Sequence, residues 1–335
     1  MTQRNAIILA AGKGTRMKSV KNKVMHELID RPILAYTAQA LEEAGASRIL
    51  IVAGYQAQSL MDAFPQYEFA LQKEQLGTGH AVMQATALQD ADGLTLVVNG
   101  DVPALKAETL KNLYEAGKEH SLVLLSAILE DGAHYGRVVR EENGQVAAIV
   151  EAKDCSPDQK QIREINAGVY CFNNRDLFDS LSEMTTDNAQ HEYYLTDLVK
   201  ILRSKGKSVA ALPAEDPNEM AGINTVGELA EVGAWLNDNT VRYWLEQGVQ
   251  IVDPKRTVIG KDVKIGHDVI LYPDTELLGK TEIGSFSEIY PHTWIRDSKI
   301  GENCRIQSCV LEGCTVEDGS SLTMKAMKEG TEIQA

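Results

Sequence analysis

The stretch from Ile259 to Ile295 reads IGKDVKIGHDVILYPDTELLGKTEIGSFSEIYPHTWI and carries an aliphatic residue at every sixth position. The register slips by one residue and then resumes at Ile300 and Ile306. A period of six fits neither an α-helix nor a single strand, and it is typical of hexapeptide repeats that stack into a parallel β-helix. The aliphatic side chains point inward and fill the axis of such a coil. We therefore predict a β-helix of about four coils over residues 251–335.

The first two thirds of the chain have a different pattern, in which short apolar runs alternate with amphipathic stretches. The runs at residues 7–10, 49–53 and 94–98 read as buried strands, and residues 33–45 have the spacing of a helix. This alternation predicts an α/β fold with a mostly parallel sheet that is covered on both faces. Ligands bind such sheets at the carboxyl ends of the strands, so the residues that follow each run are the candidate site.

Length and charge restrict the domain count and the partners. The 335 residues suggest two domains, which we place at residues 1–225 and 251–335 with a connecting helix at 226–250. The net charge of −15 argues against a nucleic-acid surface, because such a surface needs clustered Lys and Arg. The apolar run at residues 6–11 is too short for a signal peptide or a membrane span. Five cysteines without a C-x-x-C pair read as packed, reduced thiols, so we expect a cytoplasmic protein without a membrane partner.

The first apolar run continues into a glycine-rich loop, LAAGKGTRM, at residues 9–17. Gly12 and Gly14 allow the backbone to turn its N–H groups toward a ligand. Lys13 and Arg16 add positive charge to the same loop. This combination suits a polyphosphate, although a plain turn between a strand and a helix would also explain the glycines.

Two better-known phosphate-binding loops are excluded at this place. The P-loop and the dinucleotide fingerprint both need Gly where this chain has Ile7 and Met17, respectively. Lys23 follows a few residues later and could neutralise an α-phosphate. Taken alone, a lysine at such a place is more often a solvated surface charge.

A second polar loop, QKEQLGTGH, occupies residues 72–80. The side-chain amide of Gln72 offers both the donor and the acceptor that the edge of a pyrimidine base needs, and a polar turn before a helix is the alternative. Further polar residues beside Gly end later apolar runs, at Tyr135–Arg137, Val150–Lys153, Glu164–Gly168 and Ala221–Asn224.

The third apolar run ends in Asn99-Gly100-Asp101. An Asp at the carboxyl end of a strand is well placed to hold Mg²⁺ against phosphates. The same Asp could instead cap the helix that follows Pro103. The residues alone leave both interpretations open.

The motifs taken together and in this order resemble the bacterial N-acetylglucosamine-1-phosphate uridylyltransferases, the N-terminal half of a bifunctional enzyme. The segment NAQHEYYLTD at residues 188–197 also matches that family, and the resemblance covers essentially the whole chain. It implies a Rossmann-like nucleotidyltransferase domain, a left-handed β-helix and a product that is a precursor of the cell wall. It also implies assembly into a homotrimer through the β-helix.

The resemblance implies a role for each candidate residue. The substrates would be UTP and N-acetylglucosamine 1-phosphate, and the cofactor would be Mg²⁺ bound by Asp101 and Asn224. Arg16 and Lys23 would be catalytic through their contacts with the phosphates. The remaining substrate contacts would come from Leu9, Ala10, Ala11, Gly12, Lys13 and Gly14 on the phosphates, from Gln72, Gly77 and Thr78 on uracil, from Gly136, Glu151 and Asn166 on the sugar, and from Asn99, Gly100 and Asp101.

The sequence departs from the family at two site positions. Asn22 stands where the family has Pro before the lysine, and we expect a looser loop there because Pro fixes φ. Asn99 stands where the family often has Tyr, which puts that sugar contact in doubt.

Two other functions fit the same architecture. One is a glucose-1-phosphate nucleotidyltransferase that uses UTP, dTTP or ATP, and the other is a regulatory subunit without catalysis. The second would be expected to lose the charged loop residues, and this chain keeps Lys13, Arg16, Lys23 and Asp101. The bifunctional enzymes carry their acetyltransferase residues in further coils. Since this sequence has no counterpart of those coils, we expect no acetyltransferase activity.

Overall fold

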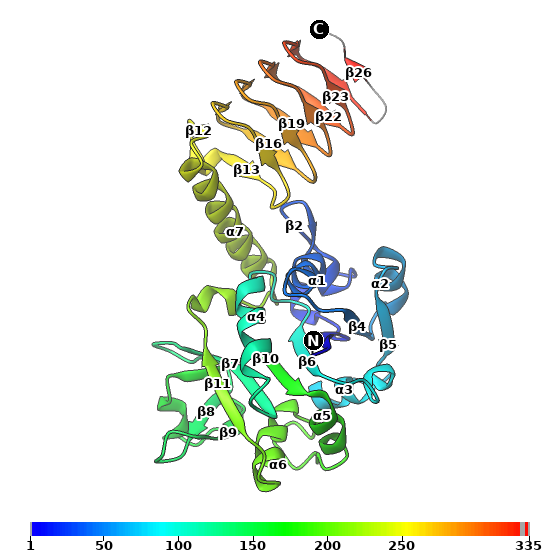
Figure 1. The fold of residues 1–335 in the computed structure, drawn as a ribbon, viewed down its shortest axis with the longest axis vertical. Helices are drawn as coiled ribbons and strands as arrows, with labels where there is room; N and C mark the ends of the chain where they lie inside the picture. The colour runs from blue at the N-terminus through cyan, green and yellow to red at the C-terminus, as the bar shows by residue number, and fades with distance from the viewer. Residues whose placement is uncertain (1, 329–331, 334–335) are drawn as a thin grey trace. The chain divides into compact units, whose positions relative to one another are not determined.

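The computed structural model describes residues 2–328 and 332–333. The chain divides into two compact units (Figure 1). The first contains Met1–His26 and Pro32–Val226, and the second contains Glu27–Arg31 and Gly227–Ala335. The short segment Glu27–Arg31 therefore belongs with the C-terminal unit, although it lies near the start of the chain.

The first unit is built on a sheet in the order β11-β7-β10-β6-β1-β4-β5, with β8 and β9 attached beside β10. Strands β6, β1, β4 and β5 are parallel, whereas β10 runs antiparallel to both β6 and β7. The sheet is thus mostly parallel, as predicted. Its strands are β1 (Arg4–Ala10), β4 (Arg48–Ala53), β5 (Glu68–Leu71), β6 (Leu94–Asn99), β7 (Leu122–Ile128), β8 (Arg137–Arg140), β9 (Val146–Val150), β10 (Glu164–Asn173) and β11 (Val209–Pro213).

Helices cover both faces of this sheet. Neighbouring residues of β1 show why, because Ile7 and Ile8 are both fully buried and belong to two different hydrophobic clusters. A strand that is buried on both faces is mostly apolar along its length, which explains the continuous apolar run at residues 6–10. The helices are α1 (Ile33–Glu43), α2 (Ala57–Ala63), α3 (Thr78–Met83), α4 (Ala107–Ala116), α5 (Asn174–Leu181) and α6 (Leu198–Ser204).

The second unit is a left-handed parallel β-helix with three five-stranded sheets, and Figure 1 shows its coils stacked from β12 toward β26. It has five coils, one more than predicted, because the stacking continues after Ile306 as far as Ile333 with spacings of five and six residues. The first sheet contains β12 (Gln250–Ile251), β15 (Ile270–Leu271), β18 (Glu288–Ile289), β21 (Arg305–Gln307) and β24 (Ser321–Thr323). The second contains β13 (Thr257–Ile259), β16 (Thr275–Leu278), β19 (Thr293–Arg296), β22 (Val310–Glu312) and β25 (Ala326–Met327), and the third contains β14 (Lys264–Ile265), β17 (Glu282–Ile283), β20 (Lys299–Ile300), β23 (Thr315–Val316) and β26 (Glu332–Ile333).

The repeating aliphatic residues line the interior of the coil in three columns. Ile259 lies beside Leu277, which lies beside Ile295, so residues eighteen apart stack on the same face. All three side chains are fully buried. Helix α7 (Val226–Glu246) contributes Val241 to the same hydrophobic cluster.

A hairpin of the second unit, formed by β2 (Glu27–Leu28) and β3 (Arg31–Pro32), docks on the coils. Asp30 is 5% exposed and accepts hydrogen bonds from the Arg31 guanidinium and from the Gly279 N–H, at 3.0 Å. Arg31 also donates to Asp262 at 2.7 Å, and Arg296 donates to the Asp30 carbonyl. Because the buried carboxylate has both an ion partner and hydrogen bonds, its burial is compensated.

Gly284 has no room for a side chain, which gives a test of coil packing. A Cβ at this position would lie 2.4 Å from the Gly301 carbonyl carbon and 2.6 Å from the Glu302 nitrogen. Backbone atoms cannot move aside as a flexible side chain can, so we expect Gly284→Ala to destabilise the β-helix by about 1–3 kcal/mol. Thermal unfolding followed by circular dichroism measures this. Glu302→Ala changes an exposed side chain of the next turn and should leave the transition in place.

Candidate active site

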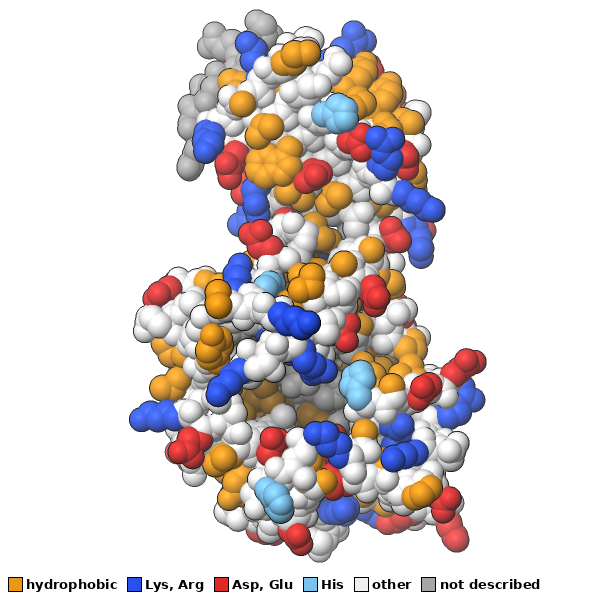
Figure 2. Space-filling view, turned by 180° about the vertical axis from the view of Figure 1, so that it is seen from behind, with side chains coloured by type: hydrophobic (Ala, Val, Ile, Leu, Met, Phe, Trp, Pro, Cys, Tyr) orange, Lys and Arg blue, Asp and Glu red, His pale blue; other side chains and the backbone are white. Residues whose placement is uncertain are grey.

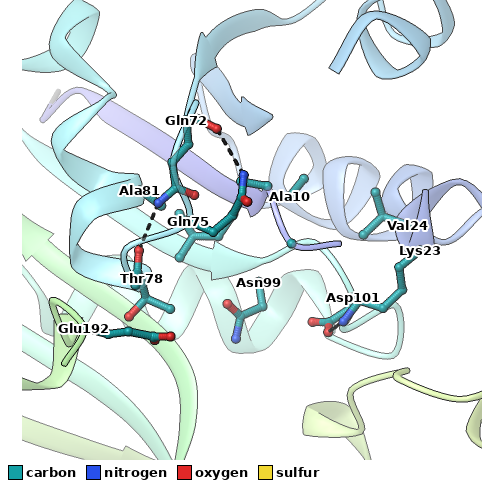
Figure 3. A pocket seen from close by; sticks show the side chains of 14 residues that line it. Ala10, Lys23, Val24, Gln72, Gln75, Thr78, Ala81, Asn99, Asp101 and Glu192 are labelled. Atoms are coloured by element: carbon teal, nitrogen blue, oxygen red, sulfur yellow. Dashed lines mark hydrogen bonds and ion pairs between the residues drawn. The ribbon is translucent and has the colours of Figure 1, made fainter. Parts of the chain in front are cut away.

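A cavity of about 260 Å³ lies at the carboxyl ends of β1 and β6 (Figure 3). The parallel register places Leu9 beside Asn99, so the loops that leave these two strands meet at one edge of the sheet. Of the predicted substrate and catalytic residues, those that line the cavity are Leu9, Ala10, Ala11, Gly12, Lys23, Gln72, Gly77, Thr78, Asn99 and Asp101. The cavity is also lined by Gln75, the second glutamine of the predicted polar loop, and by Val24, Ala81 and Glu192, which were not among the predicted contacts.

The glycine-rich loop is shaped by close packing at Gly14. Its φ is +59°, and a Cβ there would lie 2.6 Å from the Cβ of Lys23. Gly12, in contrast, has open space around it. Lys13 and Arg16 are exposed on the same loop and do not line the cavity. The space-filling view shows the first unit hollowed on one face, with Lys and Arg side chains around the hollow (Figure 2).

Lys23 begins a short 3-10 turn that Asn22 holds in place. The Asn22 side chain accepts a hydrogen bond from the Val24 N–H at 3.1 Å and donates to the Tyr55 carbonyl at 2.7 Å. Asn22 is 1% exposed, and its φ of −56° is close to the value that Pro would impose. The expectation of a looser loop was therefore wrong, because two side-chain hydrogen bonds replace the rigidity of the ring.

Four side chains converge on one point beside the cavity. Lys23 Nζ forms an ion pair with Asp101 and donates to Asn224 Oδ1 at 3.0 Å. Arg16 donates to the same Asn224 oxygen at 2.9 Å. Asn224 lies far away in the sequence, and a backbone hydrogen bond of 2.9 Å from the Ile223 N–H to the Asp101 carbonyl brings it here.

The proposed metal ligands are suitable for a divalent cation. The carboxylate of Asp101 and the amide oxygen of Asn224 both contact one positive charge, the Lys23 ammonium, so they can face a single cation. Mg²⁺ prefers oxygen ligands and typically takes one or two from the protein and others from phosphates and water. Asp101 does not act as the N-cap of the helix that follows, since Lys106 is the N-cap of α4.

The loop at residues 72–80 is held from two sides. Gln72 is buried, and its side-chain amide donates to the Gly77 carbonyl at 3.1 Å. Gly77 has a φ of +111°, and a Cβ there would lie 2.5 Å from the Tyr193 carbonyl. Glu192 and Tyr193 belong to the segment 188–197 that resembles the family, but the resemblance assigned no contact to them.

A second cavity of about 230 Å³ shares Leu9, Thr78 and Asn99 with the first. It contains the three predicted sugar contacts, Gly136, Glu151 and Asn166. Ala167, Gly168, Leu195 and Thr196 also line it and belong to segments that the sequence analysis singled out, although no contact was assigned to them, whereas His134 and Tyr170 were not predicted. Because the two cavities share residues, a group bound in the first cavity would lie beside a group bound in the second.

Glu151 is the ionisable group of the second cavity. Burial raises its pKa above the usual range, while a 3.0 Å hydrogen bond from the Thr196 hydroxyl opposes this shift. The charges of Asp154 and Asp197 add to the upward shift of the pKa. Asn166 donates to the Tyr170 hydroxyl at 2.7 Å, and its own oxygen accepts from the Gly168 N–H.

Gly100 does not line either cavity. A Cβ there would lie 3.1 Å from the Leu34 side chain and 3.3 Å from the Leu9 carbonyl. Gly100 therefore allows α1 to pack closely behind the site. The predicted substrate contact of Gly100 remains a prediction.

The chain is similar to known proteins over most of its length. The family model of the MobA-like NTP transferase domain matches residues 6–248. A bifunctional protein GlmU from Geobacillus thermodenitrificans is 41% identical over 324 residues, which are 95% of this chain and 70% of that protein. Further proteins of the same name are 40% identical in Limosilactobacillus reuteri, over 96% of this chain and 72% of that protein, and 42% identical in Exiguobacterium sibiricum, over 91% and 69%.

This chain belongs to the GlmU family. It is a nucleotidyltransferase, of the kind that makes UDP-N-acetylglucosamine. The crystal structure of a UDP-glucose pyrophosphorylase complexed with UDP-glucose matches with a TM-score of 0.57 and 18% identity, covering 73% of this chain and 100% of that one. At this identity the match supports the fold alone. Among the described residues, no helix is both long and apolar enough to span a membrane.

Glu151→Gln tests how burial affects this carboxyl group. Since the folded pKa is raised, the folded protein holds more protons than the unfolded chain between the two pKa values. The free energy of unfolding should therefore fall as the pH rises through that interval. In Glu151→Gln we expect the free energy of unfolding not to show this decrease with pH. The variant should be more stable than the wild type at pH 8, because its neutral amide can still accept a hydrogen bond from Thr196.

Urea unfolding at pH 5 and pH 8 measures the effect. Glu142→Gln is the matched control, because Glu142 is exposed and should behave as the wild type does. An identical pH dependence in Glu151→Gln and the wild type would contradict the assignment of a raised pKa.

Proposed function

We propose that this nucleotidyltransferase binds UTP in the first cavity and N-acetylglucosamine 1-phosphate in the second, and that the sugar phosphate attacks the α-phosphorus in line. The observation that supports this most is the sharing of Leu9, Thr78 and Asn99 by the two cavities. A nucleotide and a sugar phosphate in adjoining cavities would bring the two reacting phosphates together. Pyrophosphate is then the leaving group.

The reaction needs no general base. The second pKa of a phosphate monoester is about 6, so the attacking oxygen is already largely ionised at pH 7. The residues therefore act by positioning the phosphates and by offsetting their charge. Lys23 would contact the α-phosphate, while Lys13 and Arg16 would bind the other phosphates from the exposed side of the loop.

Asp101 and Asn224 would hold Mg²⁺ in this scheme. The metal would supply charge neutralisation between the sugar phosphate and the α-phosphate. The two protein oxygens leave the remaining coordination positions to phosphate oxygens and water, which is how Mg²⁺ is commonly held.

The polar groups in the second cavity support an N-acetylated sugar. Glu151 can accept a hydrogen bond from a sugar hydroxyl, and Asn166 offers both an amide N–H and a carbonyl oxygen. Asn99 lines both cavities, and its side-chain amide carries both a donor and an acceptor. Glucose 1-phosphate would leave part of this polar surface unpaired, which is costly when the groups are buried.

A coupled assay of pyrophosphate release tests the assignment. With Mg²⁺ and UTP, we expect turnover with N-acetylglucosamine 1-phosphate to exceed that with glucose 1-phosphate by at least about tenfold, the effect of one unpaired hydrogen bond. Asp101→Asn should lower turnover by about 10²–10³-fold. Glu108→Gln removes an exposed carboxylate from the first turn of α4 and should retain full activity.

A preference for glucose 1-phosphate would move the chain to the glucose branch of these enzymes. No pyrophosphate release with either sugar would favour a regulatory subunit. Full activity in Asp101→Asn would contradict the proposed metal site.

We also propose that the chain forms a homotrimer through its β-helix. The outward-facing column of the second sheet is mostly apolar, because it consists of Val258, Glu276, Trp294, Val310 and Ala326. The corresponding column of the third sheet is charged, with Lys264, Glu282 and Lys299. A mostly apolar face beside a charged one suits contact between copies of the chain. We propose residues 1–225 as the nucleotidyltransferase domain, residues 226–250 as the connecting helix and residues 251–335 as the β-helix that forms the trimer.

The double substitution Trp294→Glu and Val310→Glu should convert the trimer to monomers. Two carboxylates placed in an apolar contact would lose their hydration without a partner. Light scattering coupled to size exclusion gives the mass directly. Lys264→Glu and Lys299→Glu on the charged face form the matched control, and this pair should remain trimeric.

The environment of the cysteines supports a reducing compartment. All five are free and buried, and Cys304 and Cys309 donate to nearby backbone carbonyls as packed residues do. Thiols persist in this form in the cytosol. We therefore propose the cytoplasm as the site of action.

A further inference from the structure

The proposed metal ligands already serve as partners of the chain's own cations. Lys23 Nζ contacts Asp101 Oδ2 and lies 3.0 Å from Asn224 Oδ1, and Arg16 Nη2 lies 2.9 Å from the same Asn224 oxygen. The side chains of Lys23 and Asp101 are only 15% and 17% exposed, so water screens their ion pair incompletely. Figure 3 shows the Lys23 side chain reaching Asp101 at the end of the cavity.

Two cations cannot occupy the same position. An ammonium in contact with both oxygens blocks the place that a divalent cation needs, and the two positive charges would repel each other strongly at such a short separation. A metal ion can therefore bind Asp101 only after the Lys23 side chain has moved away. The same movement leaves Lys23 Nζ free to bind another anionic group.

The surroundings of Lys23 allow its side chain to move while its backbone stays fixed. Asn22 anchors the turn through two side-chain hydrogen bonds, and Val24 is buried next to it. Gly14 packs against the Lys23 Cβ, so the stem passes a residue that has no side chain. The four-carbon stem of a lysine has enough rotatable bonds to swing its ammonium between two partners.

We propose that Lys23 has two positions and that a divalent cation selects between them. In one position the ammonium neutralises Asp101 and Asn224. In the other it contacts the α-phosphate of the nucleotide, while the metal takes its place. This exchange rests on the proposed function, because it uses the same nucleotide and metal sites.

The exchange couples two binding events. A metal ion at Asp101 releases Lys23 toward the phosphate, and a phosphate that captures Lys23 clears the metal ligands. Each ligand therefore increases the affinity for the other, as linkage requires. The exchange also avoids an uncompensated negative charge at Asp101 before substrates bind.

The affinity for Mn²⁺ in the absence of nucleotide tests the competition, and electron paramagnetic resonance of the free ion measures it. Lys23→Met removes the competing ammonium, and we expect its affinity for Mn²⁺ to rise about tenfold, as for the loss of one charged hydrogen bond. Lys13→Met is the matched control, since it removes a charge from the neighbouring loop without touching Asp101. Because exposed charges are screened, its effect should stay within about twofold.

Chemical labelling tests the movement itself in the unaltered protein. We expect acetylation of Lys23 by acetic anhydride, quantified by mass spectrometry, to accelerate when Mn²⁺ is added without nucleotide. Lys73 is exposed and gives the reference rate in the same sample. In Asp101→Asn, where the ion pair is lost, Lys23 should be labelled quickly with or without Mn²⁺.

The outcomes separate this proposal from the proposed function. If saturating Mn²⁺ leaves the labelling of Lys23 unchanged, or if Lys23→Met binds Mn²⁺ no more tightly than Lys13→Met does, the exchange is wrong even in an active enzyme. If Mn²⁺ accelerates labelling but no pyrophosphate is released with any sugar phosphate, the exchange stands and the assigned reaction is wrong.

Discussion

The parallel pairing of β1 with β6 is the constraint on which the site depends. The two strands share a register in which Leu9 lies beside Asn99, and both carry side chains into hydrophobic clusters on the two faces of the sheet. Burial on both faces leaves these strands no freedom to slip, because a shift by one residue would exchange the two faces. The loops after them must therefore meet, and they bring Gly12 and Asp101 into one cavity.

The charges of the site are arranged on this rigid edge. Lys23, Asp101 and Asn224 come from three separate loops, and each loop is held by backbone or side-chain hydrogen bonds that leave the charged groups themselves adjustable. A catalyst of phosphoryl transfer needs such groups in place before the charge develops. Glu151 differs from these groups, because its burial raises its pKa and so disfavours its charged form. This suits a side chain that would contact the uncharged part of a sugar.

The β-helix is stabilised by the stacking of equivalent residues in successive coils. Each coil places one aliphatic side chain on each of three inner faces, and the next coil repeats the arrangement above it. Stability then comes from contacts between neighbouring coils, as in other repeat folds. At Gly284 the neighbouring coil approaches so closely that only glycine fits. At Gly279 the backbone N–H donates a hydrogen bond to the buried Asp30 carboxylate.

The sequence alone determined the parts of this protein that follow from local periodicity. The six-residue repeat predicted the β-helix, and the continuous apolar runs predicted a sheet covered on both faces. It also supplied the residue types of the site, including Lys23 and Asp101. Only the tertiary structure showed that Asn22 stiffens the Lys23 turn, that Tyr193 holds the loop at Gly77, and that Asn224 reaches Lys23, because these contacts join residues distant in sequence and leave no periodic signal.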